Sequence, residues 1–175
     1  MKIFNTINLI FCFILINSCN KKAENNYMNY FDFDDLEYYH KNISENDVMA
    51  EYEKSKSVNY DKNYLKIVES EYPEKLNDLK FITNLIKFGY EKKEFEKTNH
   101  TRINQIFSKN NCTELTANGC IPIYRDIFIF KQKGKIIGIA KVCFDCKMAY
   151  IIGSKQNWDS FGECGDYEKL NFLLK

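Results

Sequence analysis

One short motif in the chain has residue types and a spacing that can do chemistry. It is the C-x-x-C of Cys143 and Cys146 in the stretch VCFDC. Two thiols at this spacing support disulfide exchange when one is a thiolate, which typically forms where a strand meets the start of a helix. The flanking residues here predict two strands instead, and the negative charge of Asp145 raises the pKa of a neighbouring thiol. A redox role is therefore an alternative to a structural disulfide or simple packing.

The same two cysteines are also half of a zinc site. A structural zinc ion needs two further ligands, and they usually come from a second motif of the same kind. The sequence has no second C-x-x-C, and the remaining candidate ligands are Cys112, Cys120, Cys164, His40 and His100. We therefore expect no cofactor, and zinc at Cys143 and Cys146 is the alternative.

The sequence names no catalytic residue. It lacks the nucleophile elbow, the zinc-protease helix motif, the P-loop and the dinucleotide fingerprint. Because His40 and His100 are the only histidines, a serine or cysteine nucleophile has few possible bases. Arg125 and Asp126 would point to opposite faces of a strand, where Arg125 pairs with an acidic residue of the helical half or binds an anion. The prediction leans away from an enzyme.

The first residues have the pattern of a targeting segment. Lys2 gives a positive end, and the unbroken apolar run LIFCFILI covers residues 9–16. About eight apolar residues are far fewer than the roughly 20 that span hydrocarbon as a helix. A run of this length is typical of a secretory signal peptide.

The four residues Ile16 to Cys19 resemble the lipobox of bacterial lipoproteins. An aliphatic residue stands three positions before the cysteine and a small residue directly before it, whereas Asn17 is a less usual residue at its position. The resemblance implies that residues 1–18 are removed as a signal peptide and that Cys19 carries fatty acyl chains such as palmitate. At about 0.8 kcal/mol per buried CH₂, two or more chains anchor a protein stably. We expect a lipid-anchored protein of a bacterial cell envelope, on the periplasmic face or the cell surface; an uncleaved signal anchor or a secreted protein is the alternative.

Composition predicts a flexible tether and then one domain. Residues 19–30 are mostly polar and have little to bury, which favours disorder. Residues 31–175 are enough for a single domain with a real core. The formal net charge of +1 gives no basic excess for nucleic acid. The expected partners are the membrane, through the anchor, and a protein in the envelope.

Five cysteines belong to the predicted domain, because Cys12 leaves with the signal and Cys19 is acylated. They are Cys112, Cys120, Cys143, Cys146 and Cys164. An odd number leaves at least one thiol unpaired in a monomer, and an oxidising envelope favours one or two disulfides among the rest. Cys112 and Cys120 enclose a short loop, and a bridge between them would contribute roughly 2–3 kcal/mol. The other pairings stay open.

The first half of the domain reads as helices. Ser44 and Asp47 predict a capping box that opens a helix through about Lys56. Residues 61–72 predict a second helix, and residues 101–110 a shorter one. The clearest apolar stripe begins at Pro73, a favoured first helical residue, and ends at Gly89. Residues 36–43 predict an edge strand.

The second half changes to strands. Three runs rich in β-branched and aromatic residues cover 121–130, 135–144 and 148–152, with Gly134 in the turn between the first two. The first run is apolar on both faces, which is typical of a central strand. Asp166 predicts the cap of a closing helix. The expected fold class is α+β: N-terminal helices on a small C-terminal antiparallel sheet, built as a three-stranded meander with a fourth edge strand as an option, and a closing C-terminal helix.

The stretches CIPIYRD, VCFDC and FGECGDY together resemble small uncharacterised lipoproteins of Bacteroidota over the last third of the chain. The resemblance implies an envelope location and a shared fold, and it carries no activity. We therefore expect a membrane-anchored, non-enzymatic binding or interaction module. A metal- or thiol-dependent protein built on Cys143 and Cys146 is one alternative, and an immunity-type or inhibitor module for a partner protein is the other.

Overall fold

The structure, a computed structural model, describes residues 28–112 and 119–175. The predicted signal peptide, Cys19 and most of the predicted tether lie outside the described residues. No helix in the described ranges is long and apolar enough to cross a membrane.

A five-stranded antiparallel sheet forms the centre of the domain. Its order is β3-β2-β5-β6-β7, and every neighbouring pair runs antiparallel. The strands are β2 (Asp35–His40), β3 (Glu91–Lys93), β5 (Asp126–Gln132), β6 (Lys135–Cys143) and β7 (Met148–Ile152). The α+β class is confirmed. The edge position predicted for residues 36–43 is wrong, because the charged strand β3 pairs with the outer side of β2.

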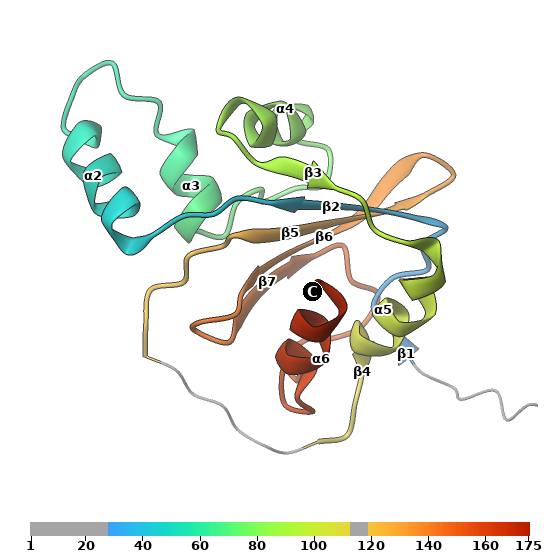
Figure 1. The fold of residues 1–175 in the computed structure, drawn as a ribbon. Coiled ribbons are helices and arrows are strands. Elements are labelled where there is room, and N and C mark those ends of the chain that lie inside the picture. Colours follow the sequence, from blue (N-terminus) through green and yellow to red (C-terminus); the bar gives the residue numbers. More distant parts are fainter. Residues whose placement is uncertain (1–27, 113–118) are drawn as a thin grey trace, which may run out of the picture.

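Helices cover both faces of this sheet (Figure 1). One face carries α2 (Glu45–Ser55), α3 (Asn63–Glu69) and α4 (Leu79–Lys87), and the other carries α5 (His100–Ile106) and α6 (Asp166–Leu173). Alternate residues of a strand point to opposite faces. Ile127 and Ile129 of β5 accordingly join the core under α3 and α4, whereas Phe128 and Phe130 join the core under α5 and α6. The central strand is apolar on both sides because both sides are covered.

The structure confirms two predictions made from local sequence, a helix cap and a hairpin turn. Ser44 accepts a hydrogen bond from the backbone N–H of Asp47, whose carboxylate accepts one from the backbone N–H of Ser44, so the capping box opens α2. Lys133 and Gly134 both have positive φ and form the two-residue turn between the paired residues Gln132 and Lys135. Such a turn matches the twist of the two strands that it joins.

The start predicted for the fourth helix is wrong. α4 begins at Leu79 rather than at Pro73, because the Asp78 side chain accepts a hydrogen bond from the backbone N–H of Lys80 and caps the helix there. The shorter helix buries Phe81 and Leu85, while Leu79 stays 89% exposed. Part of the predicted apolar stripe therefore never reaches the core. Gly89 ends the segment with φ of 81°, as predicted.

Asp166 does not cap the closing helix as predicted. It is the first residue of α6, the cap position belongs to Gly165, and the Asp166 carboxylate accepts the backbone N–H of Gly162 at 3.0 Å. The carboxylate at the start of α6 is thus buried and turned toward the preceding loop.

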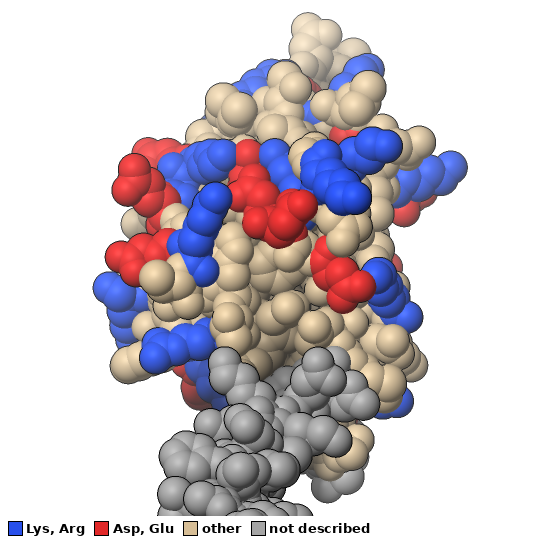
Figure 2. Space-filling model, turned by 90° about the vertical axis from the view of Figure 1, so that its right-hand side faces the viewer, with Lys and Arg blue, Asp and Glu red and all other residues tan. Residues whose placement is uncertain are grey.

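Short elements close the side of the domain next to α5. β1 (Met28–Asn29) pairs with β4 (Ser108–Lys109), and η2 (Lys97–Asn99) leads into α5. Tyr30, the last residue of the predicted tether, is completely buried. Figure 2 shows this side with Lys and Arg interspersed among Asp and Glu, so neither sign forms a continuous patch on it.

Candidate functional site

A pocket with a polar floor lies where β2 ends and β5 begins. His40, the last residue of β2, is directly opposite Asp126, the first residue of β5. Both side chains lie on the same face of the sheet as Tyr38, because Tyr38 and His40 are two residues apart on one strand. The pairing register of two strands far apart in the sequence therefore brings three polar side chains together.

One oxygen atom of the Asp126 carboxylate contacts both of the other side chains. Asp126 Oδ1 accepts the Tyr38 hydroxyl at 2.6 Å and lies 2.8 Å from His40 Nδ1. Asp126 is 5% exposed, whereas the His40 side chain is 36% exposed. Burial and the adjacent Asp126 carboxylate raise the pKa of Tyr38, so its hydroxyl keeps its proton and donates. Because a carboxylate only accepts, His40 carries a proton on Nδ1 and leaves Nε2 for another partner.

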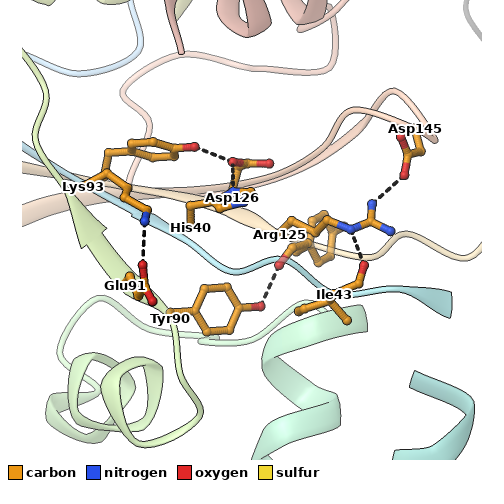
Figure 3. A network of polar contacts seen from close by, with 10 residues as sticks. His40, Ile43, Tyr90, Glu91, Lys93, Arg125, Asp126 and Asp145 are labelled. Atoms are coloured by element: carbon orange, nitrogen blue, oxygen red, sulfur yellow. Dashed lines mark hydrogen bonds and ion pairs between the residues drawn. The ribbon is translucent and has the colours of Figure 1, made fainter. Parts of the chain in front are cut away.

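The pocket above this floor has a volume of about 450 Å³. Its wall is polar on the β3 side, where Lys93 binds Glu91 at 2.5 Å (Figure 3), and apolar on the side of α6 and the β6–β7 turn. The lining residues are Tyr38, His40, Lys93, Glu94, Phe95, Asp126, Phe144, Asn171, Leu173 and Leu174. A volume of this size and a few converging polar groups are typical of small-molecule sites.

Arg125 fixes the backbone that enters β5. Its Nε donates to the carbonyl oxygen of Ile43, and a terminal nitrogen lies 2.5 Å from Asp145 in the β6–β7 turn (Figure 3). Tyr90 donates its hydroxyl to the carbonyl oxygen of Tyr124 at 2.6 Å. The acidic partner predicted for Arg125 therefore exists, but it comes from the sheet and not from the helices. These contacts hold Asp126 at a fixed place in the pocket floor.

The cysteines form two disulfides. Cys112 is bonded to Cys164 and Cys120 to Cys146, with Cα–Cα distances of 5.5 and 5.9 Å. Cys143 is a buried free thiol. The predicted bridge between Cys112 and Cys120 is wrong, because the fold places each of them beside another cysteine. Cys112 lies beside Cys164, which precedes α6, and Cys120 lies beside Cys146 in the β6–β7 turn.

The structure does not bring together a zinc site at Cys143 and Cys146. Cys146 is in a disulfide and so cannot be a thiolate ligand in this state. Within residues 28–112 and 119–175, no group of three or more His, Cys, Asp or Glu is placed to hold a metal ion. His100, one of the proposed ligands, instead contacts the ring of Phe33 at 5.3 Å between ring centres.

A second hollow lies beside the Cys120–Cys146 disulfide. It has a volume of about 480 Å³ and is bounded by α2, the segment before β5 and the β6–β7 turn. Met49, Tyr52 and Ile121 on its wall are 61%, 40% and 69% exposed. Cys143 lies at its base. We refer to this hollow as the disulfide groove.

Sequence reasoning missed the His40–Asp126 pair. The two residues are 86 positions apart, and only the register between β2 and β5 joins them. An acidic residue at the start of an apolar strand was the one local signal. No family model, curated protein or solved structure matches the chain.

Proposed function

We propose that this chain is a lipoprotein of a bacterial envelope, anchored through Cys19, whose domain binds a small amphipathic molecule in the His40 pocket. The observation that carries the binding proposal is a buried carboxylate and a half-exposed imidazole at the floor of a pocket of about 450 Å³. The lipobox-like sequence before Cys19 supports the anchor. Two disulfides in the domain suit an oxidising compartment.

The floor of the pocket presents hydrogen-bond acceptors. A carboxylate has about four lone-pair sites, and Tyr38 and His40 use Oδ1 of Asp126. His40 turns Nδ1 toward Asp126, and its Nε2 is an acceptor whenever the ring carries a single proton on Nδ1. Among the described residues that line the pocket, Lys93 is the only lysine or arginine, and its ammonium group is paired with the Glu91 carboxylate. The preferred polar end of a ligand is therefore a donor, such as a primary ammonium group.

The rest of the ligand would be apolar. Phe95, Phe144 and Leu173 also line the pocket. An aryl or alkyl body of a few carbon atoms would bury area against them, at about 25 cal/mol per Å². An aryl-alkyl ammonium ion is the simplest probe with both features.

The binding proposal is tested by NMR titration of the isolated domain with phenethylamine and with hydrocinnamate, its carboxylate counterpart. Phenethylamine should shift the amide signals of His40, Lys93 and Asn171 in a saturable way, and hydrocinnamate should not. Asp126→Asn should weaken phenethylamine binding about tenfold, since a charged hydrogen bond contributes roughly 1.5–3 kcal/mol. Asp32→Asn, at an exposed carboxylate that binds Lys155, is the control and should bind normally. Equal binding of both probes, or no effect of Asp126→Asn, would contradict the proposal.

The anchor is tested separately in cells. Cys19→Ser should move the protein from the membrane fraction to the soluble fraction and abolish incorporation of an alkyne-labelled fatty acid. Ser18→Ala keeps a small residue before the cysteine and serves as the control, which should stay in the membrane fraction and keep its label. A Cys19→Ser protein that remains with membranes at wild-type levels would rule out the anchor and leave the pocket untouched.

A further inference from the structure

Cys143 lies directly beside a disulfide. It ends β6, and Cys146 follows three residues later in the turn before β7. The backbone N–H of Cys146 lies 3.5 Å from Cys143 Sγ and donates to it, while Cys146 Sγ is bonded to Cys120. This four-residue turn thus contains a free thiol, one sulfur of a disulfide and an amide that donates a hydrogen bond to the thiol sulfur. Thiol–disulfide exchange requires a thiol close to a disulfide sulfur, and this turn brings the two residues together.

Two basic side chains, Arg125 and Lys141, lie near this turn. Asp145, the anion between the two cysteines, is held by Arg125 at 2.5 Å. Lys141 lies on the same face of β6 as Cys143, since alternate residues share a face. Its ammonium group is 4.4 Å from the ring centre of Tyr124, a residue that packs in one cluster with Cys143 and Cys146. Arg125 thus pairs with the anion of the turn, and Lys141 contacts a residue of the cluster that contains both cysteines.

We propose that Cys120, Cys143 and Cys146 form a thiol–disulfide exchange site, separate from the His40 pocket. The Cys143 thiolate attacks Cys146 Sγ, the Cys120–Cys146 bond breaks as the Cys143–Cys146 bond forms, and Cys120 leaves as a thiolate. The proton that Cys143 loses to solvent is replaced by one that Cys120 takes up. The number of disulfides is unchanged, so the step consumes neither an oxidant nor a reductant.

The exchange moves the reactive sulfur from the interior to the surface. Cys143 is 1% exposed, whereas Cys120 is an exposed residue at the rim of the disulfide groove. A disulfide of another envelope molecule can then react at Cys120: one of its sulfurs joins Cys120 and the other leaves as a thiolate. The substrate class of the site is therefore a disulfide of another molecule. The role of Cys143 is to release Cys120 from its bond to Cys146 so that Cys120 can react.

The first test traps the exposed thiol in the folded protein. The mature protein, prepared without reductant, is incubated with iodoacetamide at pH 8, then denatured and digested with trypsin. Cys120 should gain the label with time, and the peptide 142–147, linked at first to the peptide of Cys120, should appear by itself at a mass two hydrogens below its dithiol form as Cys143 and Cys146 become bonded within it. Cys143→Ser should slow labelling of Cys120 at least about tenfold, because it removes the attacking sulfur. Equal labelling of Cys120 in both proteins, or none in either, would overturn the proposal.

A second variant asks whether the two sulfurs can bond at all. In Cys120→Ser, Cys146 has lost its partner, and the Cys112–Cys164 disulfide is untouched. The peptide 142–147 from this variant should contain the internal Cys143–Cys146 disulfide after air oxidation. If both cysteines stay as alkylatable thiols while Cys112 and Cys164 remain bonded, the attack that the proposal requires does not occur.

Discussion

The side-chain nitrogen of Lys141 donates a 2.6 Å hydrogen bond to the backbone carbonyl oxygen of Ser70, the residue that caps the C-terminus of α3. The carbonyl oxygens of Lys66 and Tyr72 lie 3.4 and 3.0 Å from the same nitrogen. Burial lowers the pKa of Lys141, and the carbonyl dipoles and the Tyr124 ring offset part of the cost of burying the charge. A side chain of the sheet is thereby tied to the end of a helix that packs on it.

Lys141→Met should lower the free energy of unfolding by about 1–3 kcal/mol, because it removes the side-chain donor to the part-buried carbonyl of Tyr72. Ser70 and Lys66 keep other donors at their carbonyls. Urea unfolding at pH 7 with the disulfides intact measures the change. Lys135→Met, at the exposed start of the same strand, is the control and should change stability by no more than about 0.5 kcal/mol. A Lys141→Met protein as stable as the wild type would mean that the cost of burying the charge equals the gain from its hydrogen bonds.

Gly138→Ala should destabilise the domain through overpacking. A Cβ atom at this position of β6 would clash with the ring of Phe31, which is stacked on Phe130 at 4.1 Å between ring centres. We expect a loss of about 1–3 kcal/mol in the free energy of unfolding, read from urea titration. Gly119→Ala meets nothing within 4 Å and serves as the control. The two variants should differ clearly; equal stabilities would show that Phe31 can move aside at little cost.

Local signals in the sequence predicted the elements whose cause is local. The capping box at Ser44 and the hairpin turn at Gly134 are each encoded within a few residues, and both are present. The helix predicted over residues 101–110 is present as α5, but it ends at Ile106 and residues 108–109 form β4 instead. α4 was misplaced because two cap signals, Pro73 and Asp78, compete, and the side-chain cap at Asp78 sets the start of the helix.

Features that depend on contacts between distant residues could not be read from the sequence. The pairing of β2 with β3 and β5 sets the place of β2 in the sheet, and the same register creates the His40–Asp126 pair. The disulfides join residues 52 and 26 positions apart, so loop length gave no guide to the pairing. Local chemistry singled out Cys143 and Cys146 as a pair, but only the fold shows that one is free and the other is bonded to Cys120.

Because of Asp166, the free energy of unfolding should fall as pH rises above the pKa that this carboxyl group has in the unfolded chain. Burial raises the pKa of Asp166, so the folded state binds its proton more tightly than the unfolded state does. Its contribution is therefore fully present below the unfolded pKa of about 3.9 and is lost as pH rises through the higher folded pKa. The stability of wild type minus that of Asp166→Asn should decrease over this window and level off above it. Urea unfolding from pH 3 to 8 measures the difference.

The control for this pH series is Asp159→Asn, at an exposed carboxylate of the loop that precedes α6. The stability of wild type minus that of this variant should change much less over the same window. A wild-type minus Asp166→Asn difference that stayed flat, or that rose with pH, would show that the N–H of Gly162 and the ammonium group of Lys169 compensate the burial of the carboxylate fully.

The two disulfides can be identified by peptide mapping, although trypsin alone cannot assign them. Cys112 and Cys120 share the tryptic peptide 110–125, and Cys143 and Cys146 share the peptide 142–147. Cleavage after Glu114 separates the first pair, and cleavage before Asp145 separates the second. When free thiols are first blocked with N-ethylmaleimide in denaturant at mildly acidic pH, which suppresses thiolate exchange, and the protein is then digested with all three proteases, Cys112 should be linked to the peptide of Cys164, and Cys120 to the peptide of Cys146. Cys143 should be alkylated only after denaturation, because its thiol is buried. A Cys112–Cys120 link would refute the placement of the β6–β7 turn beside the segment before β5, and with it the disulfide groove.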